Sequence, residues 1–238
     1  MLTFKITEDR KFIQLLDFTL NSERKSLFNY FKRKSKKAAF NVLVDRGIWD
    51  GKDSFITKDG KIAIGLWKEV YRFSELYGTD VEIDGLEQML NLSLDRDKYL
   101  KYVIQLLDGV VDERGAPISA RDYQIEGAYR AIKHRFCTQE LATSAGKTLI
   151  FYIYNSFLRD AKKIDSSNKS LIIVPNVSLI GQTAEKFELY SVGKKSWKVC
   201  TIGGPNKFNE ALFEESELII STYQSLQNLP AEIFSSPI

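Results

Sequence analysis

Two short, unbroken apolar runs in the second half of the chain restrict its fold more than any other feature. They are SLIIVP at residues 170–175 and ELIIST at 217–222. Such a run is typical of a strand that is covered on both faces, as in a parallel sheet. Segments with helical spacing lie at 147–161 and 178–190, and a further strand is expected at 197–202. Because strands and helices alternate, we predict βαβ units and an α/β fold.

The first half of the chain lacks this regular alternation. Its pattern favours a small α+β domain, followed by a linker at 109–120 that contains glycine, proline and charge but no apolar period. We therefore expect an N-terminal domain at 1–108 and a second domain at 121–238. In this half we expect strands at 2–6, 38–44 and 79–83 and helices at 21–37, 65–78 and 86–109, the last of them as one helix or as two pieces. We also expect a hairpin formed by 54–57 and 61–64.

Charge and composition exclude several classes of protein. The net charge of +3 is uneven, since residues 1–46 hold 11 Lys and Arg against 5 Asp and Glu. This concentration of positive charge favours a polyanion partner. No apolar run approaches the roughly 20 residues of a membrane span, so we expect no membrane partner and a cytoplasmic location. Two distant cysteines and a single histidine indicate neither a disulfide framework nor a zinc site.

Residues 141–148, LATSAGKT, match the phosphate-loop pattern G-x-x-x-x-G-K-[ST] except at Leu141, where the pattern has glycine. A phosphate loop presents backbone N–H groups at a helix N-terminus, together with a lysine for the phosphates and a hydroxyl for Mg²⁺. Lys147 and Thr148 supply these two groups, and Gly146 gives the backbone freedom. The residues before it are small enough for phosphate to approach: Thr143, Ser144 and Ala145. Taken alone, the string is equally consistent with an ordinary helix start.

Three further segments occur in a fixed order around this loop. They are RDYQ at 121–124, IIVPNVSLIGQ at 172–182 and STYQSL at 221–226. Their order and spacing resemble the Q-type motif, motif Ia and the segment ahead of motif II of superfamily 2 helicases, with ATSAGKT as motif I. That superfamily tolerates a residue other than glycine at the start of motif I. Residues 40–84 and the Gly-Gly pair at 203–204 resemble the phage UvsW-type helicases in particular.

The resemblance implies a partial RecA-like, P-loop NTPase fold in the second domain. It also implies an ATP-dependent DNA helicase that uses ATP and Mg²⁺, remodels branched or duplex DNA and displaces RNA from RNA–DNA hybrids in R-loops. If the protein is phage-encoded, it would act in the host cytoplasm. Motif II does not occur before Ile238, so we expect an N-terminal part of a longer helicase that is inactive by itself. The alternative is a non-enzymatic DNA-binding module with a degenerate motor fold.

The resemblance also implies roles for single residues. Gln124 would read adenine, with Arg121 and Tyr123 beside it, and residues 143–148 would bind the phosphates. Lys147 and Thr148 would be catalytic, with Thr148 also holding Mg²⁺. Five residues would lie where the first motor domain meets a nucleic-acid strand: Pro175, Leu179, Gln182, Thr222 and Gln224. For some of them a structural reading is open, since Pro175 could only end a strand and Leu179 could only pack.

A second candidate DNA contact comes from the residues themselves. Five cations stand close together after an aromatic segment: Lys32, Arg33, Lys34, Lys36 and Lys37. Helical spacing places Leu27, Tyr30 and Phe31 on one face, so we assign the aromatic side chains to the core. The cations exceed what a helix C-terminus requires, and we expect them to contact the DNA backbone. The alternative is a solvated helix end.

Overall fold

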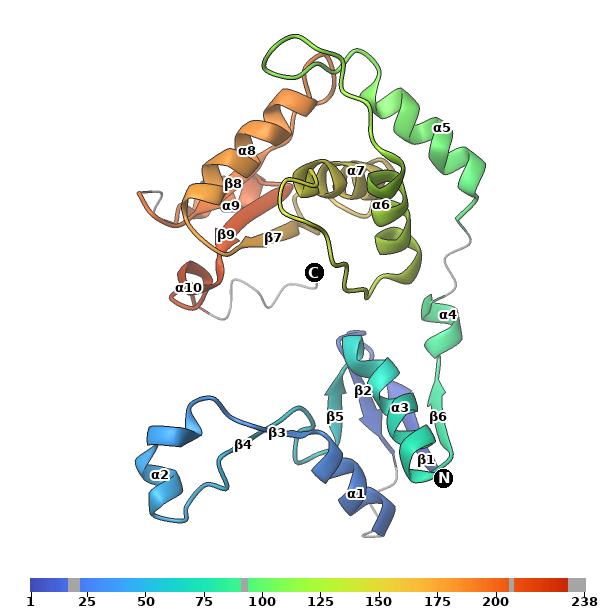
Figure 1. Ribbon diagram of the computed structural model, residues 1–238, viewed down its shortest axis with the longest axis vertical. Coiled ribbons are helices and arrows are strands. Elements are labelled where there is room, and N and C mark those ends of the chain that lie inside the picture. The colour runs from blue at the N-terminus through green and yellow to red at the C-terminus, as the bar shows by residue number, and fades with distance from the viewer. Residues whose placement is uncertain (17–21, 91–93, 206–207, 231–238) are drawn as a thin grey trace. The chain divides into compact units, whose positions relative to one another are not determined.

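The computed structural model describes residues 1–16, 22–90, 94–205 and 208–230. Residue 21 of the expected helix, residues 91–93 and the last residues of the expected second domain, 231–238, lie outside these ranges. The chain divides into two compact units, Met1–Asn91 and Leu92–Ile238 (Figure 1). Within the described ranges, no helix has the length and apolar character needed to cross a membrane.

A four-stranded sheet forms the centre of the first unit, in the order β5-β2-β1-β6. β1 pairs antiparallel with β2 and parallel with β6, and β2 pairs antiparallel with β5. The apolar side chains alternate along β1, so that Leu2 and Phe4 are buried. The strands are β1 (Leu2–Ile6), β2 (Phe12–Leu15), β5 (Lys61–Ala63) and β6 (Val81–Asp84).

Two helices, α1 (Ser22–Tyr30) and α3 (Trp67–Tyr77), complete the core of this unit. They are in contact, because the Tyr30 ring lies 5.5 Å from the Phe73 ring and its hydroxyl donates to Glu69 over 2.8 Å. α3 ends at Gly78, which has a left-handed φ of 60°. This end was expected from the sequence and is confirmed. The short α4 (Leu86–Leu90) follows β6.

The segment after α1 differs from the prediction. The helix ends at Tyr30, and residues Lys32–Lys34 form strand β3, which pairs antiparallel with β4 (Lys52–Ser54). A helix continuing to residue 37 is therefore wrong. In a helix, the cations at 32 and 36 and at 33 and 37 would face each other as unfavourable i,i+4 like-charge pairs. Strand pairing instead places Arg33 opposite Asp53.

The strand expected at 38–44 is also wrong. This segment holds the 3-10 helix η1 (Ala38–Phe40) and α2 (Val42–Asp45). The Asn41 side chain accepts a hydrogen bond from the Leu43 amide over 2.9 Å and so caps α2. The expected hairpin keeps its turn, since the Gly60 amide donates to the Thr57 carbonyl, but β4 ends at Ser54 and Ile56 makes only an isolated bridge to Ile62.

A parallel sheet of three strands, in the order β7-β9-β8, forms the centre of the second unit, and it confirms the expected strands. The strands are β7 (Ser170–Val174), β8 (Val199–Ile202) and β9 (Leu218–Thr222). The helices are α5 (Arg96–Leu107), α6 (Asp122–His134), α7 (Lys147–Asp160), α8 (Ser178–Tyr190), α9 (Glu210–Glu215) and α10 (Tyr223–Leu226).

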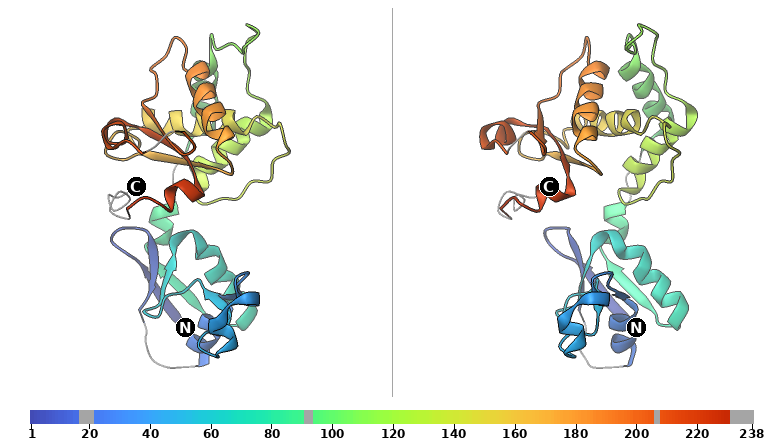
Figure 2. Two further views of the ribbon diagram at one scale, coloured as in Figure 1. Left: turned by 90° about the vertical axis from the view of Figure 1, so that its left-hand side faces the viewer. Right: turned by 60° about the vertical axis from the view of Figure 1, so that its left-hand side comes forward.

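Both faces of this sheet are covered. Leu218 and Ile220 of β9 pack into the main core with residues of α7 and α8, whereas Ile219 packs on the other side against a cluster that includes Phe213 of α9. All five residues of β9 are buried. The crossover helices α8 and α9 therefore lie on opposite faces, as in a doubly covered parallel sheet (Figure 2).

The division between the units lies at residues 91 and 92, before the expected linker at 109–120. Helix α5 accounts for the difference, because its buried face joins the core of the second unit. Tyr99, Val103 and Leu107 belong to that core, and the Tyr99 hydroxyl donates to the Ile125 carbonyl over 3.0 Å. Helical spacing alone gave no indication of which neighbour this face meets.

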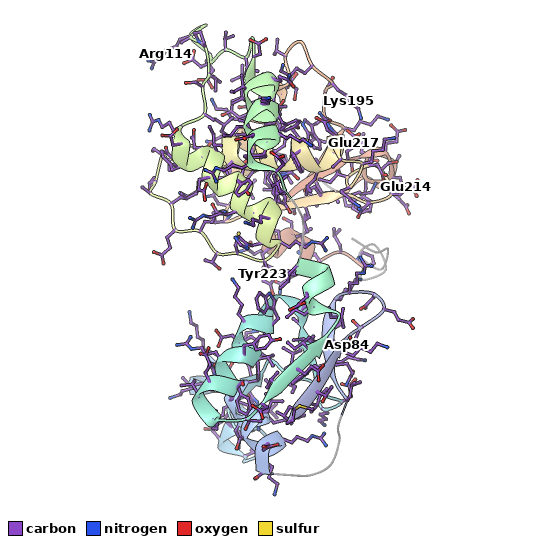
Figure 3. All side chains as sticks on the ribbon, turned by 90° about the vertical axis from the view of Figure 1, so that its right-hand side faces the viewer. Asp84, Arg114, Lys195, Glu214, Glu217 and Tyr223 are labelled. Carbon is purple, nitrogen blue, oxygen red and sulfur yellow. The ribbon has the colours of Figure 1, made fainter. Side chains whose placement is uncertain are left out.

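A buried ion pair ties the end of α7 to the start of β9. The Arg159 guanidinium lies 3.7 Å from Glu217 and 3.9 Å above the Trp197 ring, and its side chain is 7% exposed. Lys195 also reaches Glu217, over 2.9 Å, but its side chain is 68% exposed. Figure 3 labels Lys195 and Glu217 on the second unit. One carboxylate thus has a buried cation and an exposed cation as partners.

We expect these two partners to contribute very different free energies. Arg159→Leu leaves the Glu217 carboxylate buried beside an exposed lysine, and should lower the free energy of unfolding of the second unit by about 3 kcal/mol or more. Lys195→Leu, the matched control, should change it by less than about 1 kcal/mol. Native-state hydrogen exchange of the β9 amides measures both. Equal effects of the two substitutions would contradict a buried role for Arg159.

Candidate functional site

The loop at 141–148 leads directly into α7, as the phosphate-loop pattern requires. Gly146 is the residue before the helix and has a left-handed φ of 70°, and Ser144 is left-handed as well, with a φ of 62°. The first turn of α7 contains no acidic residue. Its N-terminal amides and the positive end of the helix dipole therefore meet no carboxylate from that turn.

Lys147 turns back onto the loop that precedes it. Its Nζ donates to the Ala142 carbonyl over 2.8 Å, and the side chain is exposed. The amine that would reach a phosphate is thus held at the loop by a single neutral carbonyl. An anion bound here would offer this ammonium group a stronger, charge-assisted hydrogen bond.

Two residues of α6 fasten the loop from the side. The Gln124 Nε2 and the Tyr123 hydroxyl both donate to the Ala145 carbonyl, over 2.9 Å and 3.1 Å. Gln124 Oε1 accepts from the Arg121 amide over 2.9 Å, and the Arg121 guanidinium donates to the Tyr123 hydroxyl over 3.3 Å. The structure therefore brings together the three residues of the expected Q-type motif and the phosphate loop.

This contact leaves room only for glycine at position 146. A Cβ atom there would lie 2.3 Å from Gln124 Nε2. Gln124 is 6% exposed, so the amide sits between α6 and the loop. It contacts the loop backbone, and the adenine contact expected for it stays a prediction.

Parallel pairing brings the ends of β7, β8 and β9 to one edge of the sheet, where the expected nucleic-acid residues follow two of them. The loops after these strands touch: a Cβ on Gly204 would lie 2.4 Å from Val177, and one on Gly203 would lie 2.7 Å from the Ser225 hydroxyl. The glycine pair after β8 thus allows motif Ia and the Thr-Tyr-Gln segment to meet.

The five residues expected at a nucleic-acid strand fall into two groups. Pro175, Gln182 and Gln224 are exposed. Leu179 packs against the main core, and Thr222 is 3% exposed. The Thr222 hydroxyl accepts from the Ser225 amide over 3.2 Å and so caps α10. For Leu179 and Thr222 the contacts are structural, and any strand contact would fall to exposed neighbours such as Tyr223 (Figure 3).

A mostly apolar pocket of about 430 Å³ lies beside the loop, between α6, α7 and β7. Leu141 and Lys147 line it, together with Cys137, Phe151 and Ile173. Segment 136–141, which leads into the loop, is not a strand. Within the described ranges, no group of three or more His, Cys, Asp or Glu side chains is placed to hold a metal ion.

The predicted basic residues lie in the first unit, on and next to β3. Arg33, Lys34, Lys36 and Lys37 are exposed, and Lys32 is half-buried. Lys32 pairs with Asp50 over 3.3 Å, and the Arg33 guanidinium lies 5.4 Å from the Tyr30 ring centre. The aromatic residues Tyr30 and Phe31 contact each other, and Phe31 is buried, as expected for the core.

Comparisons with known proteins find one matching family and similar solved structures. Residues 117–233 match the family model described as Type III restriction enzyme, res subunit. Two solved structures of UvsW from bacteriophage T4, described as a helicase, match 99% of this chain with a TM-score of 0.83 and 21% identity. The chain covers 79% of the first UvsW chain and 45% of the second. A search of curated proteins finds no match.

The chain has the fold of the UvsW helicase. The expected resemblance to the UvsW-type helicases is confirmed at the level of the fold, and so is the fold class. This comprises an α+β unit followed by a RecA-like unit with a parallel sheet. The matched region, 117–233, includes the loop at 141–148 and every residue expected at a nucleic-acid strand in the second unit.

The site also contains residues that the sequence did not single out. Ala142 supplies the carbonyl that holds Lys147, and Ser225 and Val177 lie so close to the glycine pair that a side chain there would collide with them. Only the Gly-Gly pair carried a sequence signal, since adjacent glycines mark a close backbone approach. The alanine carbonyl carries no signal, because every residue type has one.

We expect Gly146→Ala to distort the loop for two separable reasons. The left-handed φ costs about 1–2 kcal/mol for a residue with a Cβ, and the added atom collides with Gln124. Combining Gly146→Ala with Gln124→Ala removes the amide and should relieve the collision. The two substitutions together should then lower the free energy of unfolding by less than the sum of their separate effects, which a double-mutant cycle measures. Gly181→Ala in α8, where a Cβ meets nothing within 4 Å, should be neutral or stabilising. Additive losses would contradict the contact.

Proposed function

We propose that the chain is the N-terminal part of an ATP-dependent DNA helicase. The observation that carries the proposal is the Lys147 ammonium, which is exposed at the N-terminus of α7 and bonded to a carbonyl of its own loop. The helicase-type fold and the family match support the same function.

In this proposal the second unit binds the ATP phosphates. Ser144 and Gly146, both with left-handed backbone, turn the loop around the N-terminus of α7, which is the setting in which successive amides bind anions. Lys147 would leave Ala142 for the β- and γ-phosphates. Thr148, the second residue of α7, would direct its hydroxyl to Mg²⁺, which neutralises phosphate charge when bound.

Arg121, Tyr123 and Gln124 would stand at the adenine side of this site. The hydrogen bonds from Tyr123 and Gln124 to the Ala145 carbonyl join this segment to the phosphate loop. A nucleotide that shifts Gln124 would therefore also shift the loop carbonyl. We assign Gln124 the role of coupling the two halves of the nucleotide site.

DNA is the proposed second substrate, in branched or duplex form or as an RNA–DNA hybrid. Pro175, Gln182 and Gln224 are exposed for a strand, and the basic residues from Lys32 to Lys37 would hold phosphates. Such a protein would act in the cytoplasm. The alternative, a DNA-binding module without ATP use, keeps the DNA contacts and drops the nucleotide.

ATP binding distinguishes these two functions. We expect a fluorescent ATP analogue with Mg²⁺ to bind the chain, and Lys147→Ala to weaken binding roughly tenfold or more, because a hydrogen bond to a charged group contributes about 1.5–3 kcal/mol. Lys101→Ala, an exposed lysine of α5, is the matched control and should not change binding. Fluorescence anisotropy gives the dissociation constants. Nucleotide binding that does not depend on Lys147 would exclude this site.

Salt dependence tests the phosphate contacts of the first unit. Replacing Lys34, Lys36 and Lys37 by Gln should reduce the slope of log K against log salt by roughly 2–3, since each phosphate contact contributes about 0.9. The control replaces three exposed lysines elsewhere in the unit, Lys5, Lys11 and Lys58. Duplex binding is titrated at several salt concentrations. An unchanged slope would mean that the cations are only solvated.

A further inference from the structure

Strands β3 and β4 form a two-stranded ribbon separate from the main sheet of the first unit. Residues 32–54, here named the arm, run out along β3, pass through α2 and return along β4 (Figure 1). In Figure 1 the arm extends away from the four-stranded sheet and ends at α2.

Hydrogen bonds nevertheless hold the end of the arm in one conformation. The Ile48 and Trp49 amides both donate to the Leu43 carbonyl, over 2.9 Å and 3.1 Å. The Trp49 indole donates to the Lys52 carbonyl over 2.9 Å, and the Ser35 amide donates to the Gly51 carbonyl over 2.9 Å. The tip, which is the end of the arm around α2, is therefore held in shape by its own hydrogen bonds.

This tip exposes apolar side chains. Val42 is 56% exposed, Leu43 46% and Ile48 69%. Single exposed apolar residues are common on protein surfaces, but three gathered at the end of a projecting ribbon indicate a contact surface. Burying them against a partner removes apolar area from water and is favourable.

The stem of the arm carries an unfavourable arrangement of charge. Lys34 and Lys52 lie directly opposite each other in the ladder, where like charges destabilise a strand pair. Lys32 shares their face, because side chains alternate along a strand. Its partner Asp50 has its pKa lowered by the Lys52 amide hydrogen bond first and by Lys32 second. A polyanion would relieve the repulsion between Lys34 and Lys52.

The remaining charges of the arm do not reverse this sign. Asp53 faces Arg33 on the opposite face of the ribbon, and Asp45 lies near Arg46 at the tip. Over 32–54 there are seven Lys and Arg and three Asp. The arm thus combines a basic stem, β3 and β4, with an apolar tip. One partner that contacts both parts would need negative charge for the stem and an apolar surface for the tip.

We propose that the arm is a DNA wedge. The stem cations hold the phosphates, and Val42, Leu43 and Ile48 insert between bases that are already unstacked at the junction of a duplex with single strands. A two-stranded ribbon fits a DNA groove, and apolar side chains that enter base steps partially unstack the bases and kink the duplex. The inference rests on DNA being the substrate, and it assigns the residues that would meet the junction of a branched DNA.

A junction is the favoured target because its bases are easier to reach. In a continuous duplex, the apolar tip would have to unstack a base pair at a cost of a few kcal/mol. At a fork that cost is largely absent, so the tip gains apolar contact without it. The arm thus gives the first unit a preference for forked over linear DNA that its cations alone cannot give.

The test uses the full chain without nucleotide, so failure of ATP binding leaves it unaffected. The probe is a forked DNA with 2-aminopurine at the junction, whose fluorescence changes when a side chain contacts the unstacked base. The tip variant replaces Val42, Leu43 and Ile48 by Ser. We expect it to lose most of the fluorescence change and to bind the fork roughly tenfold more weakly, since it no longer buries apolar side chains against the bases. Its affinity for linear duplex should stay within about twofold, because the phosphate contacts remain.

Two further variants make the outcome decisive. Ile104→Ser in α5 changes the same residue type at the same exposure, 69%, and should leave the fork signal intact. Lys34→Gln with Lys52→Gln should weaken binding to the fork and to linear duplex alike. Circular dichroism confirms that each variant is folded. The proposal is overturned if the tip variant keeps the 2-aminopurine signal, if the intact chain does not bind the fork, or if the tip is needed only for binding anionic lipid vesicles.

Discussion

The parallel pairing of β7, β9 and β8 is the constraint on which the second unit depends. β9 is buried along its whole length and has a strand on either side. Because the three strands run in one direction, their following loops must meet at one edge. The close approach of Gly204 to Val177 and of Gly203 to Ser225 is the direct result. Three segments that are distant in the chain thereby become one surface, and the apolar runs of the sequence are the cause.

Elements with a strong apolar run or a clear helical period were predicted correctly from the sequence. The prediction failed for segments whose structure depends on a contact with another part of the chain. Continuous apolar runs could only be covered strands, and the helix at 65–78 had both periodicity and Gly78. The segment from Lys32 to Val44 had neither, and its fold depends on Asn41 capping α2 and on β4 arriving opposite β3. The boundary between the units was displaced because Tyr99 finds its partner Ile125 far along the chain.

The site was predicted in its residue types and incompletely in its contacts. Lys147 follows Gly146 at the start of α7, as the phosphate-loop pattern requires. That Gln124 occupies the space beside Gly146, and that Thr222 caps α10, depends on distances that no linear pattern contains. The sequence around a polar side chain near a motif is the same whether that side chain contacts a ligand or bonds to the backbone. Burial separates the two cases, and burial is a property of the folded chain.

The pairing of β1 with β6 has a consequence for synthesis. β1 occupies residues Leu2–Ile6 and its parallel neighbour occupies Val81–Asp84, so the first strand of the unit is completed by the last of its strands that the structure describes. On the ribosome, β1 can form its hairpin with β2 early, but its other edge waits until some eighty residues have followed. Long-range pairing of this kind slows folding. We therefore expect the four-stranded sheet of the first unit to be completed only after β6 has left the exit tunnel.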